Sequence, residues 1–282
     1  MAQLLTGKEV ALSITENLIE RCEVLKSKGK NPTLAIVRVG EDPSDMAYER
    51  GAVNRAGKVG VEIKKVLLDV DVSTEEVVKS IEVLNKDENV DGILVFRPLP
   101  KHIDDDAVRN AVAEEKDVDG IGDTAMAGVY SGKPLGFPPC TAAACIEILK
   151  HYEIEISGKR AVVVGRSLVI GRPVAMMLMK ENATVTICHT KTVEMDKVAR
   201  DADILIAAVG KAKAVDGSFC NSEQVIIDVG INVDEDGKMT GDVDFAEAEA
   251  KVKAITPVPG GVGAVTTSIL MKHVIEAAEK KK

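Results

Sequence analysis

Short runs of β-branched residues alternate with amphipathic segments along almost the whole chain. Apolar residues recur at three- and four-residue steps over 8–29, which predicts a helix, and the run 33–40 that follows predicts a buried strand. Further strands are predicted over 61–68, 91–96, 159–165, 183–189, 203–210 and 224–232, and further helices over part of 41–60, 73–85, 171–182, 193–200 and 267–281. Strands that alternate with helices indicate an α/β fold with a mainly parallel sheet.

The segment 116–145 interrupts this alternation, because it is rich in Gly, Pro and Asp. A chain of 282 residues also exceeds the size at which a single hydrophobic core usually stops growing. We therefore expect two domains, 1–140 and 141–265, with the boundary in this segment.

Composition and charge exclude several classes of function. The net charge of −9 and the absence of aromatic rows argue against nucleic-acid binding, which needs a basic face or stacking platforms. The chain lacks an apolar run of about 18 residues and a signal-peptide core, so we expect no membrane span and a cytoplasmic location. The five cysteines form no CxxC pair and the four histidines show no HExxH spacing, so we expect no metal site.

A glycine-rich turn follows the strand predicted over 159–165. Gly165 and Gly171 bracket this turn, and a helix is expected to begin at its far end. Backbone N–H groups in such a turn can approach a pyrophosphate, and the helix dipole adds attraction. The spacing is neither GxGxxG nor a P-loop, so an ordinary strand-to-helix turn is an equal interpretation of the turn alone.

The end of the next predicted strand bears on the choice of dinucleotide. NAD-selective folds usually place an acidic residue there to bind the ribose hydroxyls, whereas this strand ends in Cys188-His189-Thr190-Lys191. Arg166, Thr190 and Lys191 could bind a 2′-phosphate. We therefore expect NADP, with NAD as the alternative; solvated surface charges are the other interpretation of Arg166 and Lys191.

Nine sequence blocks occur in one order along the chain: LAIVRVGEDPSDMAY (34–48), DGILV with PLP (91–100), KDVDG (116–120), PCT (139–141), GKRAVVVGRSLVIGRP (158–173), ATVTICHTKT (183–192), AAVGK (207–211), IDVGIN (227–232) and TPVPGGVG (256–263). Together they resemble the methylenetetrahydrofolate dehydrogenase/cyclohydrolase family from end to end. The resemblance implies a folate-binding α/β domain, completed by the C-terminal helix over 266–282, a Rossmann-like NAD(P)-binding domain with a parallel sheet, and a homodimer. It also implies oxidation of 5,10-methylenetetrahydrofolate to the methenyl form, which most members then hydrolyse to 10-formyltetrahydrofolate.

The same resemblance implies roles for single residues. Tyr48 and Asp119 match the catalytic, substrate-binding positions: the tyrosine stacks near the pterin, and the aspartate hydrogen-bonds it. The loop that walls the folate cleft is matched by Pro257, Gly260 and Gly261. The cofactor-binding positions are matched by Gly165, Arg166, Ser167, Gly171 and Pro173 in the turn, Thr190 and Lys191 near the adenosine ribose, and Gly210 and Ile231 along the nicotinamide half.

Four departures from the family pattern concern the folate cleft and its rim. Ala52 stands where the family has a lysine one helical turn after Tyr48, and Phe96 stands where it has a glutamine. The others are Ile121-Gly122-Asp123 after KDVDG and Ala264-Val265 after the glycine-rich loop. Hydride transfer mainly needs positioning, but hydrolysis needs proton transfer, which alanine cannot perform. We therefore expect a dehydrogenase with weak or absent cyclohydrolase activity.

Three alternatives stay open at this stage: a fully bifunctional enzyme, a non-catalytic homologue, and a different oxidoreductase with a remodelled cleft. Neighbouring residues could replace the lysine, namely Arg50, Arg97, Lys58 and Glu49. Arginine is a poor base, Lys58 lies about three helical turns beyond Tyr48 and is too far away, and Glu49 directly follows Tyr48 and should point elsewhere on a helix. Arg97 is expected to pair with the glutamate tail of the substrate or with Asp119.

Overall fold

The computed structural model describes residues 1–233 and 237–281, which form two compact units. One comprises Met1–Leu12 and Thr141–Thr266, and we call it the six-stranded unit. The other comprises Ser13–Cys140 and the segment from Thr267 onward, and we call it the three-stranded unit. Helices α1 (Gly7–Ser27) and α10 (Val262–Lys280) contribute residues to both units.

Six parallel strands form the sheet of the six-stranded unit: β1 (Gln3–Leu4), β5 (Arg160–Val164), β6 (Thr184–Cys188), β7 (Ile204–Ala207), β8 (Val225–Asp228) and β11 (Ala254–Ile255). Their order in the sheet is β1-β11-β8-β7-β5-β6. β7 and β8 are buried along their whole length, as expected for central parallel strands that are covered on both faces. The connecting elements are α6 (Cys140–His151), α7 (Gly171–Lys180), α8 (Met195–Arg200), the 3₁₀ turn η2 (Gly217–Phe219), the antiparallel pair β9 (Asn232–Val233) and β10 (Met239–Thr240), and α9 (Phe245–Glu249).

The strand order creates a topological switch point between β5 and β7. From β5 the chain adds β6 on one side, and it then crosses to place β7 on the other side of β5. Open α/β sheets bind ligands outside the carboxyl ends of the strands at such a point. The loops 165–170 and 208–211 begin there, because they directly follow β5 and β7.

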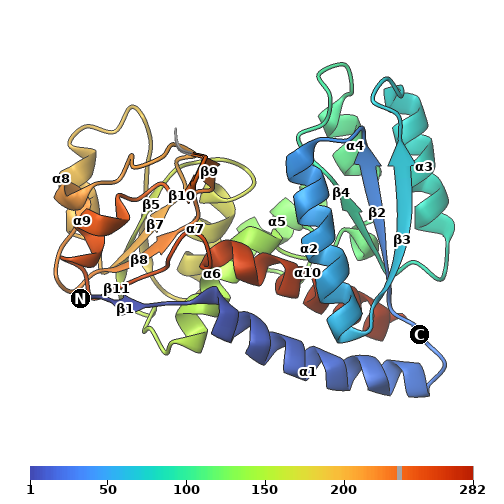
Figure 1. Ribbon diagram of the computed structural model, residues 1–282, viewed down its shortest axis with the longest axis horizontal. Helices are drawn as coiled ribbons and strands as arrows, with labels where there is room; N and C mark the ends of the chain where they lie inside the picture. The colour runs from blue at the N-terminus through green and yellow to red at the C-terminus, as the bar shows by residue number, and fades with distance from the viewer. Residues whose placement is uncertain (234–236, 282) are drawn as a thin grey trace. The chain divides into compact units, whose positions relative to one another are not determined.

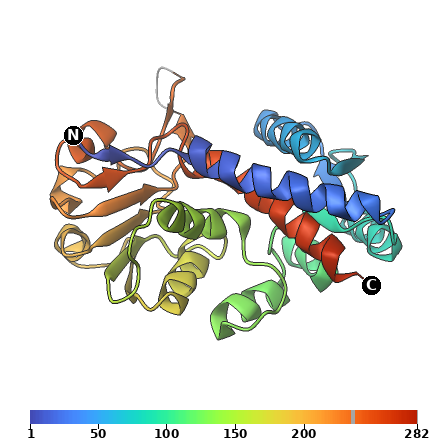
Figure 2. The same ribbon diagram turned by 90° about the horizontal axis from the view of Figure 1, so that it is seen from below.

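A smaller parallel sheet forms the centre of the three-stranded unit. Its strands are β2 (Thr33–Val39), β3 (Glu62–Leu68) and β4 (Gly92–Val95), with β2 between the other two (Figure 1). The helical elements are α2 (Pro43–Val59), α3 (Thr74–Lys86), α4 (Asp105–Ala111), the 3₁₀ turn η1 (Glu114–Lys116) and α5 (Asp123–Ser131). Within this unit α1 and α10 lie side by side (Figures 1 and 2), where Arg21 forms two hydrogen bonds with Glu279.

The predicted α/β class with parallel strands is confirmed, and the helix predicted over part of 41–60 is found, but two other local features differ from expectation. The segment 41–60 is helical over Pro43–Val59, because the Asp42 carboxylate accepts a hydrogen bond from the Ser44 N–H and Pro43 suits the first turn. The interruption at 116–145 contains α5 and the start of α6. Residues 1–12 belong with the six-stranded unit, since Gln3–Leu4 pairs with Ala254–Ile255; local sequence patterns do not report such a distant pairing.

No helix in the described ranges has the length and apolar character of a membrane span.

Lys116, the first residue of the KDVDG block, is buried and closes the C-terminal end of α3. Its ammonium donates hydrogen bonds to the carbonyl oxygens of Leu84, Asn85 and Asp87 at 2.9, 2.8 and 2.7 Å. The final carbonyl groups of a helix lack partners within the helix, and a cation there also interacts favourably with the helix dipole. Burial lowers the pKa of Lys116, and the charge of Asp87 opposes the decrease.

Replacing this lysine is expected to destabilise the protein. Lys116→Met removes three hydrogen bonds from an ammonium to carbonyl groups at the end of α3, two of which keep a backbone donor, and it should lower the free energy of unfolding by about 2–4 kcal/mol. Lys86→Met, an exposed change in the last turn of α3, is the control and should change it by less than about 0.5 kcal/mol. Urea unfolding of both variants measures the difference, and equal stabilities would contradict the capping role.

Candidate functional site

The glycine-rich turn after β5 is built on close backbone approaches. Gly165 has a φ of 132°, and a Cβ at this position would overlap the carbonyl oxygen of Ala208 in the loop after β7. A Cβ on Gly171 would overlap the carbonyl oxygen of Gly165. Only glycine at these two positions allows the backbone of the turn to pass so close to its neighbours at the switch point and to continue into α7.

Ser167 closes the same turn onto the start of α7. Its hydroxyl oxygen accepts hydrogen bonds from the backbone N–H groups of Ile170 and Gly171 at 3.2 and 3.4 Å. The side chains of Arg166 and Ser167 are exposed, whereas Pro173 is buried in α7. The turn is therefore ordered by its own bonds and presents a cation to solvent.

The turn after β6 lies next to the glycine-rich turn, since the Gly165 N–H donates to the Cys188 carbonyl at 2.9 Å. The Thr192 hydroxyl accepts from the His189 N–H at 2.9 Å, and the Lys191 N–H donates to His189 Nδ1 at 3.1 Å. Thr190 and Lys191 are exposed. Among the described residues, neither Lys191 nor Arg166 takes part in an ion pair, so both charges are available to an anion.

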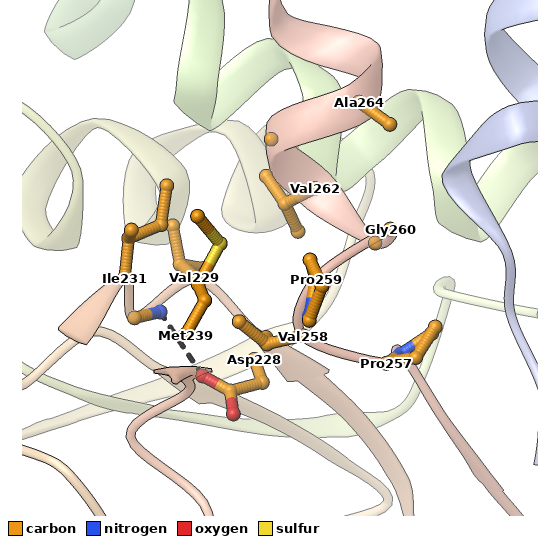
Figure 3. A pocket seen from close by; sticks show the side chains of 13 residues that line it. Asp228, Val229, Ile231, Met239, Pro257, Val258, Pro259, Gly260, Val262 and Ala264 are labelled. Carbon is orange, nitrogen blue, oxygen red and sulfur yellow. Dashed lines mark hydrogen bonds between the residues drawn. The ribbon is translucent and has the colours of Figure 1, made fainter. Parts of the chain in front are cut away.

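A cavity of about 320 Å³ lies at the carboxyl end of β8. Four sequence-predicted residues line it: Ile231, Pro257, Gly260 and Gly261. Figure 3 shows Val229, Ile231 and Met239 on one side of the cavity and Pro257–Gly260 on the other. The fold thus brings the segment after β8 together with the loop before α10, and the lining is mainly apolar.

Gly210, the remaining residue that the sequence predicts to bind the cofactor, lies in the exposed loop after β7. Its φ is 71°, and its N–H donates to the buried carboxylate of Asp242 at 2.9 Å. Sequence reasoning missed two buried residues: Asp242, and Asp228, which accepts a hydrogen bond from the Asp242 N–H. One signal was present in the sequence: Asp228 interrupts an apolar run at the end of a predicted central strand, where an unpartnered carboxylate would be costly.

In the three-stranded unit, Tyr48 lies on α2 and is half-buried. Its ring packs edge-on against Phe96, with centroids 5.7 Å apart and an interplanar angle of 83°. Ala52, one turn further along α2, is completely buried. An apolar group therefore borders the tyrosine at each of the two positions where the family pattern has a lysine and a glutamine.

Asp119 lies in the segment that follows η1 and is electrostatically coupled to Tyr48. Burial raises the pKa of Asp119 to about 7, with the charge of Asp117 adding to the rise, and the neighbouring Cys140 side chain and the charge of Arg97 opposing it. Burial also raises the pKa of Tyr48 well above its ordinary value, and the Asp119 charge contributes. Tyr48 is thus neutral near pH 7, and Asp119 exchanges its proton in that range.

Two of the possible replacements for the lysine are held in ion pairs. Arg97 forms two hydrogen bonds with Asp105, one of them 2.7 Å from Nε to Oδ1, so the expected pairing with Asp119 is not found. Buried Glu49 binds Arg38 at 2.9 Å and Lys65 at 2.6 Å. Burial opposes the charged form of Glu49, but hydrogen bonds from Lys65 and Arg38 keep its pKa below the ordinary value. Arg50 and Lys58 are exposed.

A buried histidine anchors the segment that carries Asp119. His273 Nδ1 lies 2.8 Å from the Val118 carbonyl oxygen, and the Cys140 thiol donates to the same oxygen at 3.3 Å. Phe137 stacks on the imidazole with centroids 4.9 Å apart. Burial lowers the pKa of His273 to about 4, with Lys272 and Lys280 adding to the decrease. His273 is therefore neutral near pH 7.

The described residues include no group of three or more His, Cys, Asp or Glu side chains arranged to hold a metal ion.

Comparison with known proteins identifies the family. Residues 5–119 match the model of the tetrahydrofolate dehydrogenase/cyclohydrolase catalytic domain, and residues 139–282 match the model of the NAD(P)-binding domain of the same family. The chain belongs to the tetrahydrofolate dehydrogenase/cyclohydrolase family. The predicted resemblance and the Rossmann-like character of the six-stranded unit are thereby confirmed.

Several relatives of the tetrahydrofolate dehydrogenase/cyclohydrolase family are similar over their full length. The "Bifunctional protein FolD" of Alkaliphilus oremlandii is 50% identical over 98% of this chain and 97% of its own length. The bifunctional FolD structure from Campylobacter jejuni is 37% identical, with a TM-score of 0.97 and complete coverage of both chains. A Trypanosoma brucei FolD structure, described as complexed with NADP cofactor and inhibitor, is 33% identical, with a TM-score of 0.93 and coverage of 99% of this chain and 98% of that one.

The residues present in the NAD(P)-binding part of this family member fit NADP. The glycine-rich turn lies at the switch point, the adjacent cations Arg166 and Lys191 have no ion-pair partner in the described part of the chain, and no carboxylate ends β6. A Cβ added to Gly210 or Gly260 would meet no atom within 4 Å, so both positions border open space.

Acid should destabilise the protein through His273. Because its pKa is about 4 when folded and about 6.5 when unfolded, the unfolded chain binds more protons between these values. This contribution to stability is fully present above pH 6.5 and is lost as the pH falls to 4, with a loss of about 3 kcal/mol.

Unfolding of the original chain and of His273→Asn at several pH values tests this expectation. Asparagine can donate to the Val118 carbonyl but does not titrate, so the difference in stability between the two proteins should change with pH in this window. His151→Asn, at an exposed position, is the control. A constant difference for His273→Asn would rule out the neutral buried state.

Proposed function

We propose that this chain oxidises 5,10-methylenetetrahydrofolate to 5,10-methenyltetrahydrofolate by hydride transfer to NADP. One observation carries the proposal: a turn that only glycine can form lies at the switch point beside Arg166 and Lys191, in a chain of the tetrahydrofolate dehydrogenase/cyclohydrolase family. The Trypanosoma brucei relative described with NADP supports the same cofactor.

The residues of this chain bind and orient the cofactor and the substrate, and they do not themselves react. NADP, when bound, would supply the hydride acceptor, and the turn from Gly165 to Gly171 with Arg166 and Lys191 would hold its phosphates. The ionised carboxylate of Asp119 can accept hydrogen bonds from the N–H groups of a pterin. Tyr48, supported by Phe96, provides a neutral ring for stacking. Since a substrate nitrogen provides the electrons that release the hydride, accurate positioning is the main requirement.

Paired assays on one preparation test this proposal. Reduction of NADP in the presence of methylenetetrahydrofolate, followed by the absorbance of the reduced nicotinamide, is the expected result. If folate binds but no reduction occurs with NADP or NAD, the protein is a non-catalytic member of its family. Reduction only with simple alcohols or hydroxy acids would instead indicate a different oxidoreductase on this fold.

The choice of NADP over NAD is expected to depend on Lys191. Lys191→Ser removes one cation from the position proposed for the 2′-phosphate, and it should raise the KM for NADP about tenfold. The KM for NAD should change less than about twofold, because NAD has no 2′-phosphate. Lys180→Ser, an exposed change at the opposite end of α7, is the control. Equal effects on both cofactors would contradict this role.

We also propose that hydrolysis of the methenyl product is weak or absent. Ala52 is buried and carries no proton-transfer group, and Phe96 fills the position of the family glutamine. Arg97 and Glu49 are engaged in ion pairs, so neither is a ready substitute. Loss of a general acid or base typically slows a step by about 10²–10⁴-fold. The alternative is that both activities operate, because the FolD relatives are named bifunctional.

Restoring the family residues should restore hydrolysis. The double variant Ala52→Lys with Phe96→Gln is expected to convert methenyltetrahydrofolate at least about tenfold faster than the original chain. Ala52→Met with Phe96→Gln adds similar bulk without the amine, and it should not gain activity. Methenyl absorbance above the spontaneous rate is the measurement, and thermal unfolding verifies that both variants fold. A robust enzymatic rate in the original chain would end the proposal of weak hydrolysis.

We retain the homodimer and the cytoplasmic location as further proposals. The family resemblance supports the dimer, and the chemistry of five buried free cysteines supports a reducing compartment.

A further inference from the structure

Asp242 is a fully buried carboxylate directly beneath the loop that follows β7. Its Oδ2 accepts hydrogen bonds from the N–H groups of Val209 and Gly210 at 2.6 and 2.9 Å. Its Oδ1 accepts from the Lys211 N–H and from the Asn232 side chain, both at 3.0 Å. One side chain thus binds three consecutive backbone groups of one loop and the first residue of β9.

Asp228, at the end of β8, extends this connection. Its Oδ1 accepts from the backbone N–H groups of Gly230 and Asp242, and its Oδ2 accepts from that of Val243, all at 3.0 Å. Its own N–H donates to the Thr256 hydroxyl at 2.8 Å. The two carboxylates therefore connect the loop after β7 with the segment after β8, and the backbone of Asp228 adds a link to the start of the loop before α10.

Two glycines allow this arrangement. A Cβ on Gly230 would overlap the Asp242 carboxylate, and a Cβ on Gly241 would overlap the Asp228 carboxylate. Burial raises the pKa of Asp228 to about 6, although three backbone N–H groups oppose the rise, and the charge of Asp242 adds to it. Packing two carboxylates so tightly is costly, and the backbone donors offset that cost.

The loops held in this way include exposed residues. Gly210 and Lys211 are exposed, and Ile231 is 64% exposed. Both loops begin at the carboxyl edge of the sheet, and Ile231 lines the cavity shown in Figure 3. Val209 packs against the hydrophobic core of this unit, whereas the backbone of the exposed residues Gly210 and Lys211 is held by Asp242.

We propose that Asp242 is a positioning residue for NADP: it sets the backbone of Val209–Lys211 and the side chain of Asn232 into the arrangement that receives the cofactor. The inference rests on the proposed function, because it presumes that this edge of the sheet binds NADP. Asp242 is buried beneath the loop and acts through the backbone rather than by touching the cofactor.

The decisive variant is Asp242→Asn, which preserves size but replaces one acceptor oxygen with an amide donor. That donor faces at least one backbone N–H group in either orientation, so at least one of these bonds is lost. The matched control is Gln224→Met. Gln224 is also fully buried in this unit and donates to the Ala199 and Ala202 carbonyls, but it lies at the amino end of β8, away from the loops.

The original chain and both variants are titrated with NADPH, and binding is followed by fluorescence. Thermal unfolding and the KM for methylenetetrahydrofolate are measured for the same three proteins. We expect Asp242→Asn to raise the Kd for NADPH at least tenfold and to change the KM for folate less than threefold. Gln224→Met should lower the unfolding temperature comparably but change the Kd less than twofold. Asn232→Ala, a milder change that keeps the buried carboxylate, should raise the Kd at least threefold and applies if Asp242→Asn does not fold.

The outcomes separate this inference from the proposed function. An unchanged Kd in Asp242→Asn, or an equal rise in Gln224→Met, would overturn the positioning role while leaving NADP binding intact. If Asp242→Asn does not fold, an unchanged Kd in Asn232→Ala overturns it in the same way. Failure of the original chain to bind NADPH would overturn the proposed function and, with it, this inference.

Discussion

The six-stranded unit depends on how its backbone N–H groups are satisfied at the carboxyl edge of the sheet. The loops that follow the parallel strands leave the hydrogen-bonding ladder there, and each N–H that is shielded from water needs a new acceptor. Ser167 provides one near α7, Thr192 provides one after β6, and Asp242 and Asp228 serve the loops after β7 and β8. The site thus consists largely of backbone whose shape is imposed by a few short polar side chains.

The three-stranded unit follows a different principle. Its candidate binding residues are held by burial and aromatic contact: Tyr48 lies against Phe96, and the segment with Asp119 is anchored through His273 and Cys140. Burial makes Tyr48 and His273 neutral near pH 7 and brings Asp119 into its titration range. This environment suits recognition of a flat, polar ring, and it offers few groups for moving protons to and from water.

Much of the fold and the family could be predicted from the sequence, because strand-and-helix alternation and glycine-rich turns are local properties of the chain. The turn at Gly165 and Gly171 is an example, since its backbone geometry admits only one residue type. α5 was missed, because the Gly and Pro residues around it suggested a loop. The pairing of Gln3–Leu4 with Ala254–Ile255 was missed for a different reason, because it joins the two ends of the chain.

The sequence by itself determined the α/β class, the position of the cofactor turn, the family, and the absence of a lysine and a glutamine at Ala52 and Phe96. Only the tertiary structure decided which charges are engaged: Arg97 pairs with Asp105, Glu49 with Arg38 and Lys65, and Asp242 with a loop about 30 residues away in the chain. Residue types and spacing report local conformation. The burial of a side chain and its ion-pair or hydrogen-bond partners depend on contacts between distant segments. These contacts determine the charge and the mobility of each side chain.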